Sequence, residues 1–252
     1  MIIVLLLISL VLCSSYQLMK PISLSLKPST LKRNNVLYSI NNNNNNNNVK
    51  NDNVIDDDDD DDDDDSLKND MIVSDITRCE FTGPGCVLIA QKNEFDHFLC
   101  NQAVFIYEHG SRGTCGVILE RPSAFTMGET SPNIGVFSPN TLFMGGGSGE
   151  DTALMFHKYD LSGYSKYIGG GIYLGGIREA RQLLEERKAH PKDFKFIFNN
   201  VQWQPGQLEQ EIAEGRWDVV RIPLDMVLRQ DITGSLWNQA RRNIELNDRE
   251  NK

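Results

Sequence analysis

The sequence lacks the local spacings on which many catalytic and metal-binding sites depend. It contains no C-x-x-C pair, no H-x-x-x-H and no G-x-S-x-G. Such spacings bring metal ligands, or the serine of a nucleophile elbow, into position within one short element. We therefore expect no metal and no cofactor, and no locally assembled catalytic set favours an enzyme.

Positive charge is also scarce. The formal net charge is −10, but ten of the acidic residues form the single run Asp56–Asp65. From Met71 onward there are 19 Lys and Arg against 23 Asp and Glu, a balance of −4. Binding to nucleic acid rests on Lys and Arg that neutralise phosphates. We therefore expect no nucleic-acid partner.

Cysteine is sparse in the part of the chain that can fold. Cys79, Cys86, Cys100 and Cys115 allow two disulfides arithmetically, but they form no dense framework, and a domain of this size folds without one. Cys86 and Cys115 lie in apolar, strand-like runs. There a reduced cysteine behaves as a small hydrophobic residue.

The first 74 residues read as a leader and a spacer. Residues 1–15 contain an apolar run too short to span a bilayer, which is typical of a signal peptide. Residues 16–50 are basic, rich in Ser and free of Asp and Glu, as in transit peptides. Residues 51–74 complete a linker of Asn and Asp runs. We expect delivery to a plastid, with the secretory pathway as the alternative.

A single domain is expected over residues 75–252, with no further stretch long and apolar enough to span a membrane. Strand-like runs outnumber helical ones and do not alternate regularly with them, which favours an α+β fold over a doubly wound one. The expected strands are Cys86–Ala90, Ala103–Tyr107, Thr114–Leu119, Thr141–Met144, Ala153–His157, Gly171–Leu174, Phe194–Phe198 and Asp218–Ile222. The expected helices are Ile177–His190, a short one around Leu208, and Ser235–Glu245.

Glycine-rich runs offer weak signals of ligand binding. Gly145–Gly149 follows an expected strand, and its backbone amides could hold an anion. It lacks the ending of a P-loop and a following helix, and a tight turn that needs positive φ explains it equally well. Gly169–Gly171 and Gly175–Gly176 are expected to permit bulges or close backbone approach in a bent sheet.

Histidines and carboxylates supply the remaining single-residue candidates. His97, His109 and His157 have no local partner at ligand spacing, so each is expected to be a hydrogen-bonded structural residue. Asp225 and Asp231 form a conceivable carboxylate pair, but nothing in the sequence fixes their separation.

Glu120-Arg121-Pro122 follows an expected strand. Pro122 is expected to end the pairing, and Arg121 to form an ion pair with Glu108 or Glu120 at the sheet edge. An arginine beside a glycine turn also suits an anionic small molecule. The candidate ligand pocket therefore comprises Glu108, His109, Arg121, Gly145, Gly146 and His157.

The most distinctive segment runs from Trp203 to Trp217 and reads W-Q-P-G-Q-L-E-Q-E-I-A-E-G-R-W. It predicts a turn and then a short helix with Leu208 and Ile212 on one face, while Glu209, Glu211 and Glu214 point elsewhere. We interpret the two tryptophans as anchors of the fold.

Together with motifs upstream, this segment resembles the YqgE/AlgH family. The upstream motifs are Gly85-x-x-Leu88-Ile89-Ala90, Phe98, Glu108-His109, Gly116-Val117-Ile118-Leu119-x-Arg121-Pro122, Gly145-Gly146, Phe156-His157 and Gly170-x-x-x-Leu174. The resemblance covers roughly residues 83–246. It implies a compact α+β domain with a bifurcated, partly barrel-like mixed sheet surrounded by helices, and it implies no reaction or cofactor.

The chain departs from the family pattern at three places. Glu120 replaces the Asn of an Asn-Arg-Pro motif, and Gly147 replaces the Pro of a Gly-Gly-Pro turn. Asn199-Asn200-Val201-Gln202 stands where the family has Gly-Tyr-x-Gly before the tryptophan. A family ligand site at these positions would be altered here.

Three functions remain as hypotheses. The first is a non-catalytic or small-ligand-binding domain. The alternative is a cryptic enzyme that acts on an anionic small molecule. The third is a transcriptional regulator, a role attributed to one bacterial branch of the family. The sequence has no helix-turn-helix pattern and no basic face to support that role.

Overall fold

The computed structural model describes residues 76–92, 99–231 and 235–250. Eleven strands form one sheet in the order β1-β11-β2-β3-β4-β10-β7-β9-β8, with β6 attached at β10 and β5 paired with β6. The path runs from β1 to β8 without closing into a barrel. The strands are β1 Thr77–Arg78, β2 Val87–Ala90, β3 Ala103–Gly110, β4 Gly113–Ile118, β5 Pro122–Thr126, β6 Thr141–Met144, β7 Ser148–His157, β8 Ser165–Tyr167, β9 Tyr173–Gly175, β10 Lys195–Trp203 and β11 Trp217–Arg221.

The sheet divides at β10. The first half of this strand pairs parallel with β6 and antiparallel with β7, through residues such as Phe196 and Phe198. The second half pairs antiparallel with β4, from Val201 to Trp203. The register shifts between Phe198 and Asn200, so a bulge at Asn199 separates the two halves. We call the region where β4, β6, β7 and β10 meet the fork.

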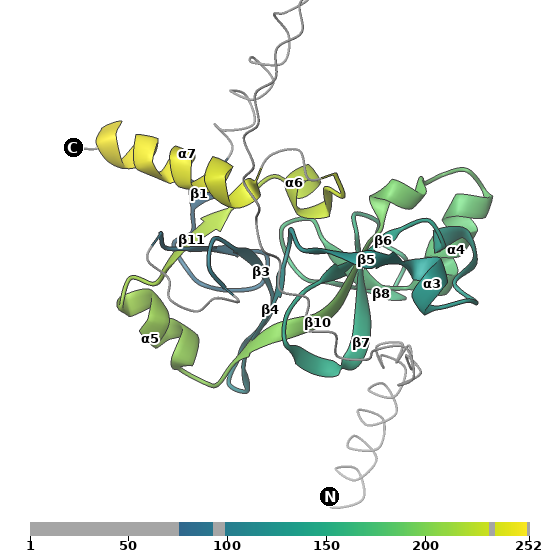
Figure 1. Ribbon diagram of the computed structural model, residues 1–252, viewed down its shortest axis with the longest axis horizontal. Coiled ribbons are helices and arrows are strands. Elements are labelled where there is room, and N and C mark those ends of the chain that lie inside the picture. Colours follow the sequence, from purple (N-terminus) through teal and green to yellow (C-terminus); the bar gives the residue numbers. More distant parts are fainter. Residues whose placement is uncertain (1–75, 93–98, 232–234, 251–252) are drawn as a thin grey trace, which may run out of the picture.

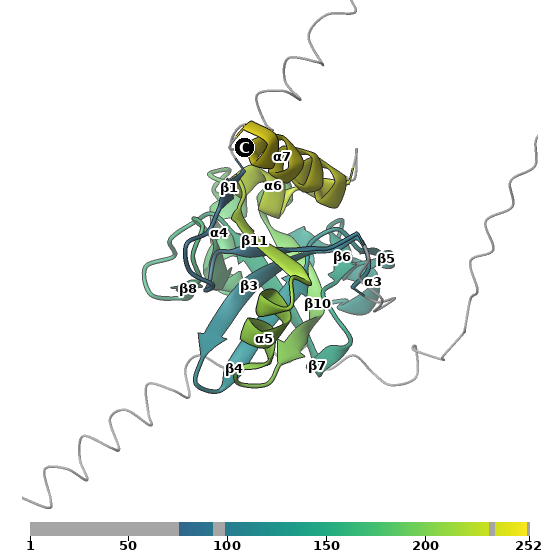
Figure 2. The ribbon, with the colours of Figure 1, turned by 90° about the vertical axis from the view of Figure 1, so that its left-hand side faces the viewer.

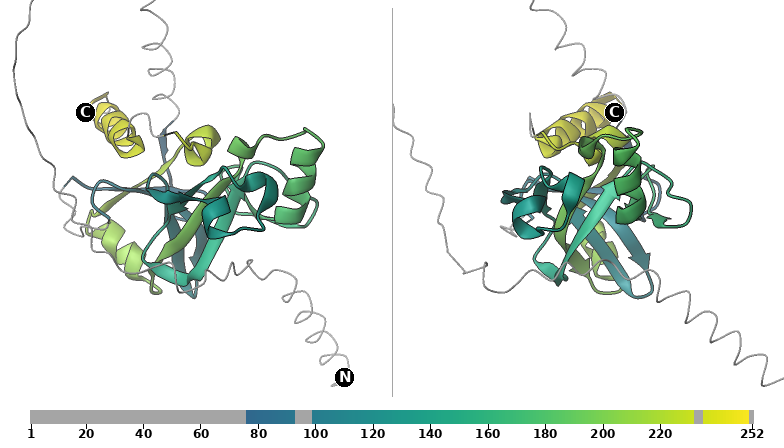
Figure 3. Two further views of the ribbon diagram at one scale, coloured as in Figure 1. Left: turned by 45° about the vertical axis from the view of Figure 1, so that its right-hand side comes forward. Right: turned by 90° about the vertical axis from the view of Figure 1, so that its right-hand side faces the viewer.

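Helices surround this sheet (Figures 1 and 2). They are α3 Met127–Thr130, η2 Gly135–Phe137, α4 Ile177–Glu185, η3 Pro191–Asp193, α5 Gln207–Ala213, α6 Leu224–Leu228 and α7 Leu236–Glu250. Helices α6 and α7 lie along one side of the sheet, whereas α3 and α4 gather near β5, β6 and β8 (Figures 1 and 3). Within the described residues, no helix is both long and apolar enough to cross a membrane.

Two apolar cores pack against the sheet, and both receive side chains from β6, β7 and β10. The larger core includes Val87–Ala90, Phe105, Phe156 and both Trp203 and Trp217. The smaller core contains Phe137, whose ring lies edge-on to the rings of Phe194 and Phe196. Side chains of β10 enter both cores, so this strand links the two cores.

The α+β prediction is confirmed, and each expected strand overlaps an observed one. Two expectations about where a strand or helix begins or ends are wrong. Pro122 does not only end a strand: it begins β5 opposite Phe143, because a first strand position does not require a backbone N–H. Helix α4 ends at Glu185 rather than His190, since Arg187 adopts a left-handed φ of 56° and the N–H of Lys188 bonds back to the carbonyl of Leu183.

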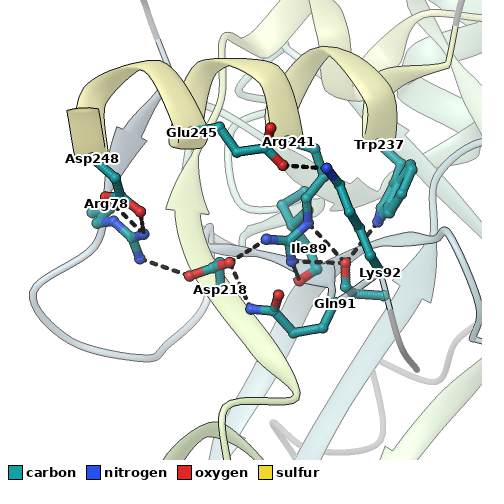
Figure 4. A network of polar contacts seen from close by, with 10 residues as sticks. Arg78, Ile89, Gln91, Lys92, Asp218, Trp237, Arg241, Glu245 and Asp248 are labelled. Carbon is teal, nitrogen blue, oxygen red and sulfur yellow. Dashed lines mark hydrogen bonds and ion pairs between the residues drawn. The ribbon is translucent and has the colours of Figure 1, made fainter. Parts of the chain in front are cut away.

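A polar network fixes α7 to the edge of the larger core (Figure 4). The buried guanidinium of Arg241 donates to the carbonyls of Ile89 and Ala90 and pairs with Asp218 at 2.5 Å. Trp237 Nε1 also donates to the carbonyl of Ala90, at 2.7 Å. Burial alone would raise the pKa of Asp218, but hydrogen bonds from Arg78 and Arg241 outweigh that effect and lower it.

Candidate functional site

Glu108 and His109 lie together at the free end of the β3–β4 hairpin. Glu108 pairs with Arg112 at 3.0 Å across the turn. His109 Nδ1 lies 2.8 Å from Thr114 Oγ1, and Nε2 lies 3.6 Å from a carboxylate oxygen of Glu209 on α5. Thr114 therefore shares a hydrogen bond with one nitrogen of the ring, and Glu209 forms an ion pair with the other only when the ring is protonated.

His157 is fully buried on β7. Its Nε2 lies 2.8 Å from the carbonyl oxygen of Gly175, and its Nδ1 accepts the backbone N–H of Tyr159 at 3.2 Å. A carbonyl can only accept, so these partners assign the neutral tautomer with the proton on Nε2. Burial lowers the pKa of His157, which keeps the ring neutral. The structural role expected for this histidine is confirmed, whereas His97 lies outside the described residues.

Gly145 and Gly146 lie at the fork, where the backbone of β10 leaves no room for a side chain. A Cβ on Gly146 would lie 1.9 Å from the carbonyl oxygen of Asn200, and one on Gly145 would lie 2.5 Å from that of Asn199. Positive φ does not explain these two glycines. Within the Gly145–Gly149 run only Gly149 has it, with φ of 126°. Close backbone approach is therefore the reason for glycine here.

Arg121 adjoins the same region through its backbone, because its carbonyl accepts the N–H of Met144 at 2.7 Å. Burial lowers the pKa of its guanidinium. Arg121 has an interaction of its own within the fold, and its expected ion pair with Glu108 or Glu120 stays a prediction. Glu108 contacts Arg112, and Glu120 contacts Arg229 at 2.5 Å.

Asn199 and Asn200 form the bulge of the fork. Asn199 has φ of 61°, a conformation that Asn tolerates better than most residues, which explains how it can stand where the family has Gly. Asn200 is only 8% exposed, and its Nδ2 donates to the hydroxyl of Tyr107 at 2.7 Å. Among the described residues, neither amide oxygen of this pair has a hydrogen-bond donor.

The fork thus brings together part of the predicted pocket. Gly145 and Gly146 pack on the bulge, the backbone of Arg121 adjoins them, and Glu108 follows Tyr107 on β3. Burial first, then Cys115 and last the charge of Glu108, raise the pKa of Tyr107. His109 and His157 are held by contacts in other parts of the sheet.

Three polar residues at important positions were not expected from the sequence. Tyr107 and Asn200 meet only because β3 and β10 are brought together by the fold, 93 positions apart in the chain. Lys195, inside the apolar run at Phe194–Phe198, is buried and donates to the carbonyls of Val227 in α6 and Arg229 just after it. A lone lysine in such a run was the available signal. Burial lowers the pKa of Lys195 to about 7.

Glu211 corrects the expected orientation of α5. It is 8% exposed and does not point into solvent. One carboxylate oxygen accepts both indole N–H groups, from Trp203 at 3.0 Å and from Trp217 at 2.8 Å. Two buried indole donors need an acceptor, and Glu211 supplies it. The carboxylate of Glu211 therefore links Trp203 to Trp217, and we call this arrangement of three side chains the clasp.

Within residues 76–92, 99–231 and 235–250, no three His, Cys, Asp or Glu side chains come together as a set that could hold an ion.

Comparisons with known proteins agree with this architecture. A family model described as AlgH-like matches residues 87–248. A UPF0301 protein of Chlorobium luteolum is 33% identical over 135 residues, which cover 53% of this chain and 71% of that protein. A UPF0301 protein of Pelodictyon phaeoclathratiforme is 29% identical over 160 residues, covering 63% and 84%. The crystal structure of a Corynebacterium diphtheriae protein is similar in fold, with a TM-score of 0.57 at 20% identity, covering 65% of this chain and 87% of that one.

Proposed function

This chain belongs to the AlgH-like family, and from that premise we propose that it is a non-catalytic domain that binds a small, hydrogen-bond-donating ligand at the fork. The observation that carries the proposal is the pair of buried amide oxygens on Asn199 and Asn200, which have no donor within the described part of the chain. A buried acceptor without a donor costs about 1–3 kcal/mol, so its presence calls for an explanation. A bound ligand would supply the missing donors.

The titratable candidates support a non-catalytic role, because their reactive atoms already have partners inside the fold. Both nitrogens of His157 are hydrogen-bonded in the neutral form. The carboxylate of Glu120 accepts from Arg229 and from the backbone N–H of Leu236. General acid–base catalysis needs a group free to exchange a proton with substrate. These groups are occupied in holding elements together.

The surroundings of the fork favour a ligand that is neutral or cationic. Amide oxygens accept hydrogen bonds, so they select amide, amine or hydroxyl donors. The exposed residues Gly147–Gly149 lie next to this amide pair, because a Cβ on Gly149 would lie 2.8 Å from the amide oxygen of Asn199.

A thermal-shift screen of three probe sets tests this proposal: small amides and polyols, primary amines, and phosphomonoesters. A ligand at roughly 100 times its dissociation constant adds about 2.7 kcal/mol, a rise of about 5–10 °C in Tm for a domain of this size. We expect members of the first two sets to raise the Tm of the wild-type protein. We expect no rise for Asn200→Leu, which removes the acceptor.

Asn140→Leu is the matched control. Asn140 is also buried with an amide oxygen that lacks a donor among the described residues, but it lies in the smaller core, where its Nδ2 donates to the carbonyls of Pro191 and Phe194. Equal loss of the shift in both variants, or no shift with any probe, would count against a site at the fork. Turnover of a metabolite that disappears in Glu108→Gln or His109→Ala would refute the non-catalytic role.

An anionic ligand beside Arg121, acted on by a cryptic enzyme, is the second candidate. One observation favours it: the partly buried guanidinium belongs to the residue whose backbone adjoins Met144, immediately before the Gly145 turn. In the same screen, stabilisation by phosphomonoesters alone, abolished in Arg121→Met, would favour this candidate.

We also propose delivery to a plastid, on the apolar residues 1–15 and the acid-free basic residues 16–50. Residues 1–50 fused to a fluorescent reporter test it in an alga whose plastid lies inside additional membranes. Reporter fluorescence in the plastid is expected. Fluorescence confined to the secretory pathway would refute it.

A further inference from the structure

Two cysteines outside the region matched by the family model lie in contact. Cys79 follows β1, and its backbone N–H bonds to the carbonyl of Val219 on β11. Cys86 precedes β2 and is buried. The two Sγ atoms are 2.9 Å apart, and the thiol of Cys79 donates to the sulfur of Cys86. A disulfide has a sulfur–sulfur distance of about 2.0 Å, so a movement of roughly 1 Å would complete the bond.

The surroundings of the pair favour a thiolate. The hydrogen bond from Cys79, then an N–H of Gly83 and the charge of Arg221, lower the pKa of Cys86 to about 6, although its burial acts in the opposite direction. The pKa of Cys79 is raised, first by its hydrogen bond to Cys86. The two sulfurs therefore share one proton near neutral pH, and only Cys79 is partly exposed.

We propose that Cys79 and Cys86 are a redox-active dithiol that forms a reversible disulfide by exchange with a small-molecule or protein disulfide. This inference is independent of the proposed ligand at the fork. It concerns the end of the sheet where β1, β11 and β2 are neighbours, away from the fork.

The exchange begins at the exposed sulfur. The shared proton moves to Cys86, and the thiolate of Cys79 attacks one sulfur of the incoming disulfide, which releases the first thiolate. Cys86 then loses its proton to solvent and attacks the sulfur of Cys79 in the mixed disulfide, which releases the second thiolate. Starting from the shared-proton state, the protein loses one proton and two electrons. The incoming disulfide takes up the electrons as two thiolates, which become thiols by taking protons from solvent.

The bond would change the short loop that it closes, residues 80–85. When both sulfurs carry a proton, the thiol of Cys86 also donates to the carbonyl oxygen of Phe81 at 3.4 Å. Oxidation removes this donor. Phe81 is 82% exposed, whereas Gly85 is pressed against Gly169 and Gly170 with no room for a Cβ. The oxidation state is therefore expected to alter the end of the loop that carries Phe81 more than the end at Gly85.

Peptide mapping of the full chain tests the proposal. The protein is equilibrated in buffers of reduced and oxidised glutathione, alkylated and digested with trypsin. Cleavage after Arg78 and Lys92 places both cysteines on one peptide, while Cys100 and Cys115 fall on others and report non-specific oxidation. We expect this peptide to become lighter by two hydrogen atoms and to lose both alkylation sites together. Dithiothreitol should reverse the change.

Single variants separate the two roles. In Cys86→Ser the attacking sulfur remains, so Cys79 should accumulate as a mixed disulfide with glutathione. In Cys79→Ser the buried Cys86 should react at least ten-fold more slowly. Full alkylation of both cysteines in wild-type protein at every glutathione ratio would overturn the proposal, as would a disulfide of either one with Cys100 or Cys115. These outcomes are measured on the wild-type chain, so the proposal can be refuted even if a variant fails to fold.

Discussion

Replacing Glu211 by alanine should destabilise the domain by about 4 kcal/mol. The change leaves the indole N–H groups of Trp203 and Trp217 buried without an acceptor, and each unpaired buried donor costs about 1–3 kcal/mol. The other carboxylate oxygen accepts from Gln207 at 3.1 Å and lies 3.5 Å from Arg216, so contacts at the rim are lost as well. We expect Tm to fall by about 8–16 °C for a domain of this size.

Glu211→Gln separates hydrogen bonding from charge. Its amide oxygen can still accept both indole donors, so the loss should be only about 1–2 kcal/mol, from the weaker neutral acceptor. Glu209→Ala on the same helix is the control, since that side chain is half exposed and its removal should change stability by less than about 0.5 kcal/mol. Urea unfolding followed by tryptophan fluorescence and far-UV circular dichroism measures all three. Equal losses in Glu211→Ala and Glu211→Gln, or no loss in either, would refute the clasp.

Three further predictions follow from the fork and from the two buried charges. Gly146→Ala should prevent correct folding or destabilise it severely, because its Cβ would meet the backbone of Asn200, whereas Gly147→Ala, with open space around its Cβ, should be neutral by thermal unfolding. Lys195 has a folded pKa of about 7, against about 10.4 in an unfolded chain, so the unfolded state binds more protons between these two pH values. The free energy of unfolding should therefore rise with pH across this window, by up to about 5 kcal/mol. Lys195→Met should abolish the rise. Asp218→Asn should cost about 3 kcal/mol by leaving Arg241 without its carboxylate. Because the folded pKa of Asp218 is lowered, its carboxylate stabilises the fold at pH values above the unfolded pKa. This stabilisation is lost as the pH falls through the folded pKa. The free energy of unfolding of Asp218→Asn should therefore fall less in acid than that of the wild-type protein.

The sequence predicted elements whose cause is local. Runs such as Phe194–Phe198 and Ala103–Tyr107 form strands because their apolar, β-branched and aromatic side chains fill a core on either face. Strands β1, β5 and β8 were not predicted, since they are short and largely exposed, and their pairing depends on a distant neighbour. Arg187 ends α4 early through a left-handed conformation that helical periodicity does not signal.

The candidate site was predictable only in part, for the same reason. Gly145 and Gly146 stood out by composition. Glycine is required there because the carbonyls of Asn199 and Asn200, in a strand about 50 positions away, leave no room for a Cβ. The indole partners of Glu211 lie six and eight positions away, yet helical spacing only placed this carboxylate away from the face of Leu208 and Ile212. A buried hydrogen-bond requirement overrode the amphipathic pattern there.

A ligand titration followed by nuclear magnetic resonance tests the proposed ligand at the fork most directly. The probe is the amide, polyol or amine that raises Tm most, and the signals are the side-chain amide groups of Asn200 and Asn140. We predict that the Asn200 signal moves saturably with the probe, that the Asn140 signal stays in place, and that Asn200→Leu no longer binds. Equal movement of both signals, or saturable binding that leaves the Asn200 signal unchanged, would contradict a ligand site at the fork.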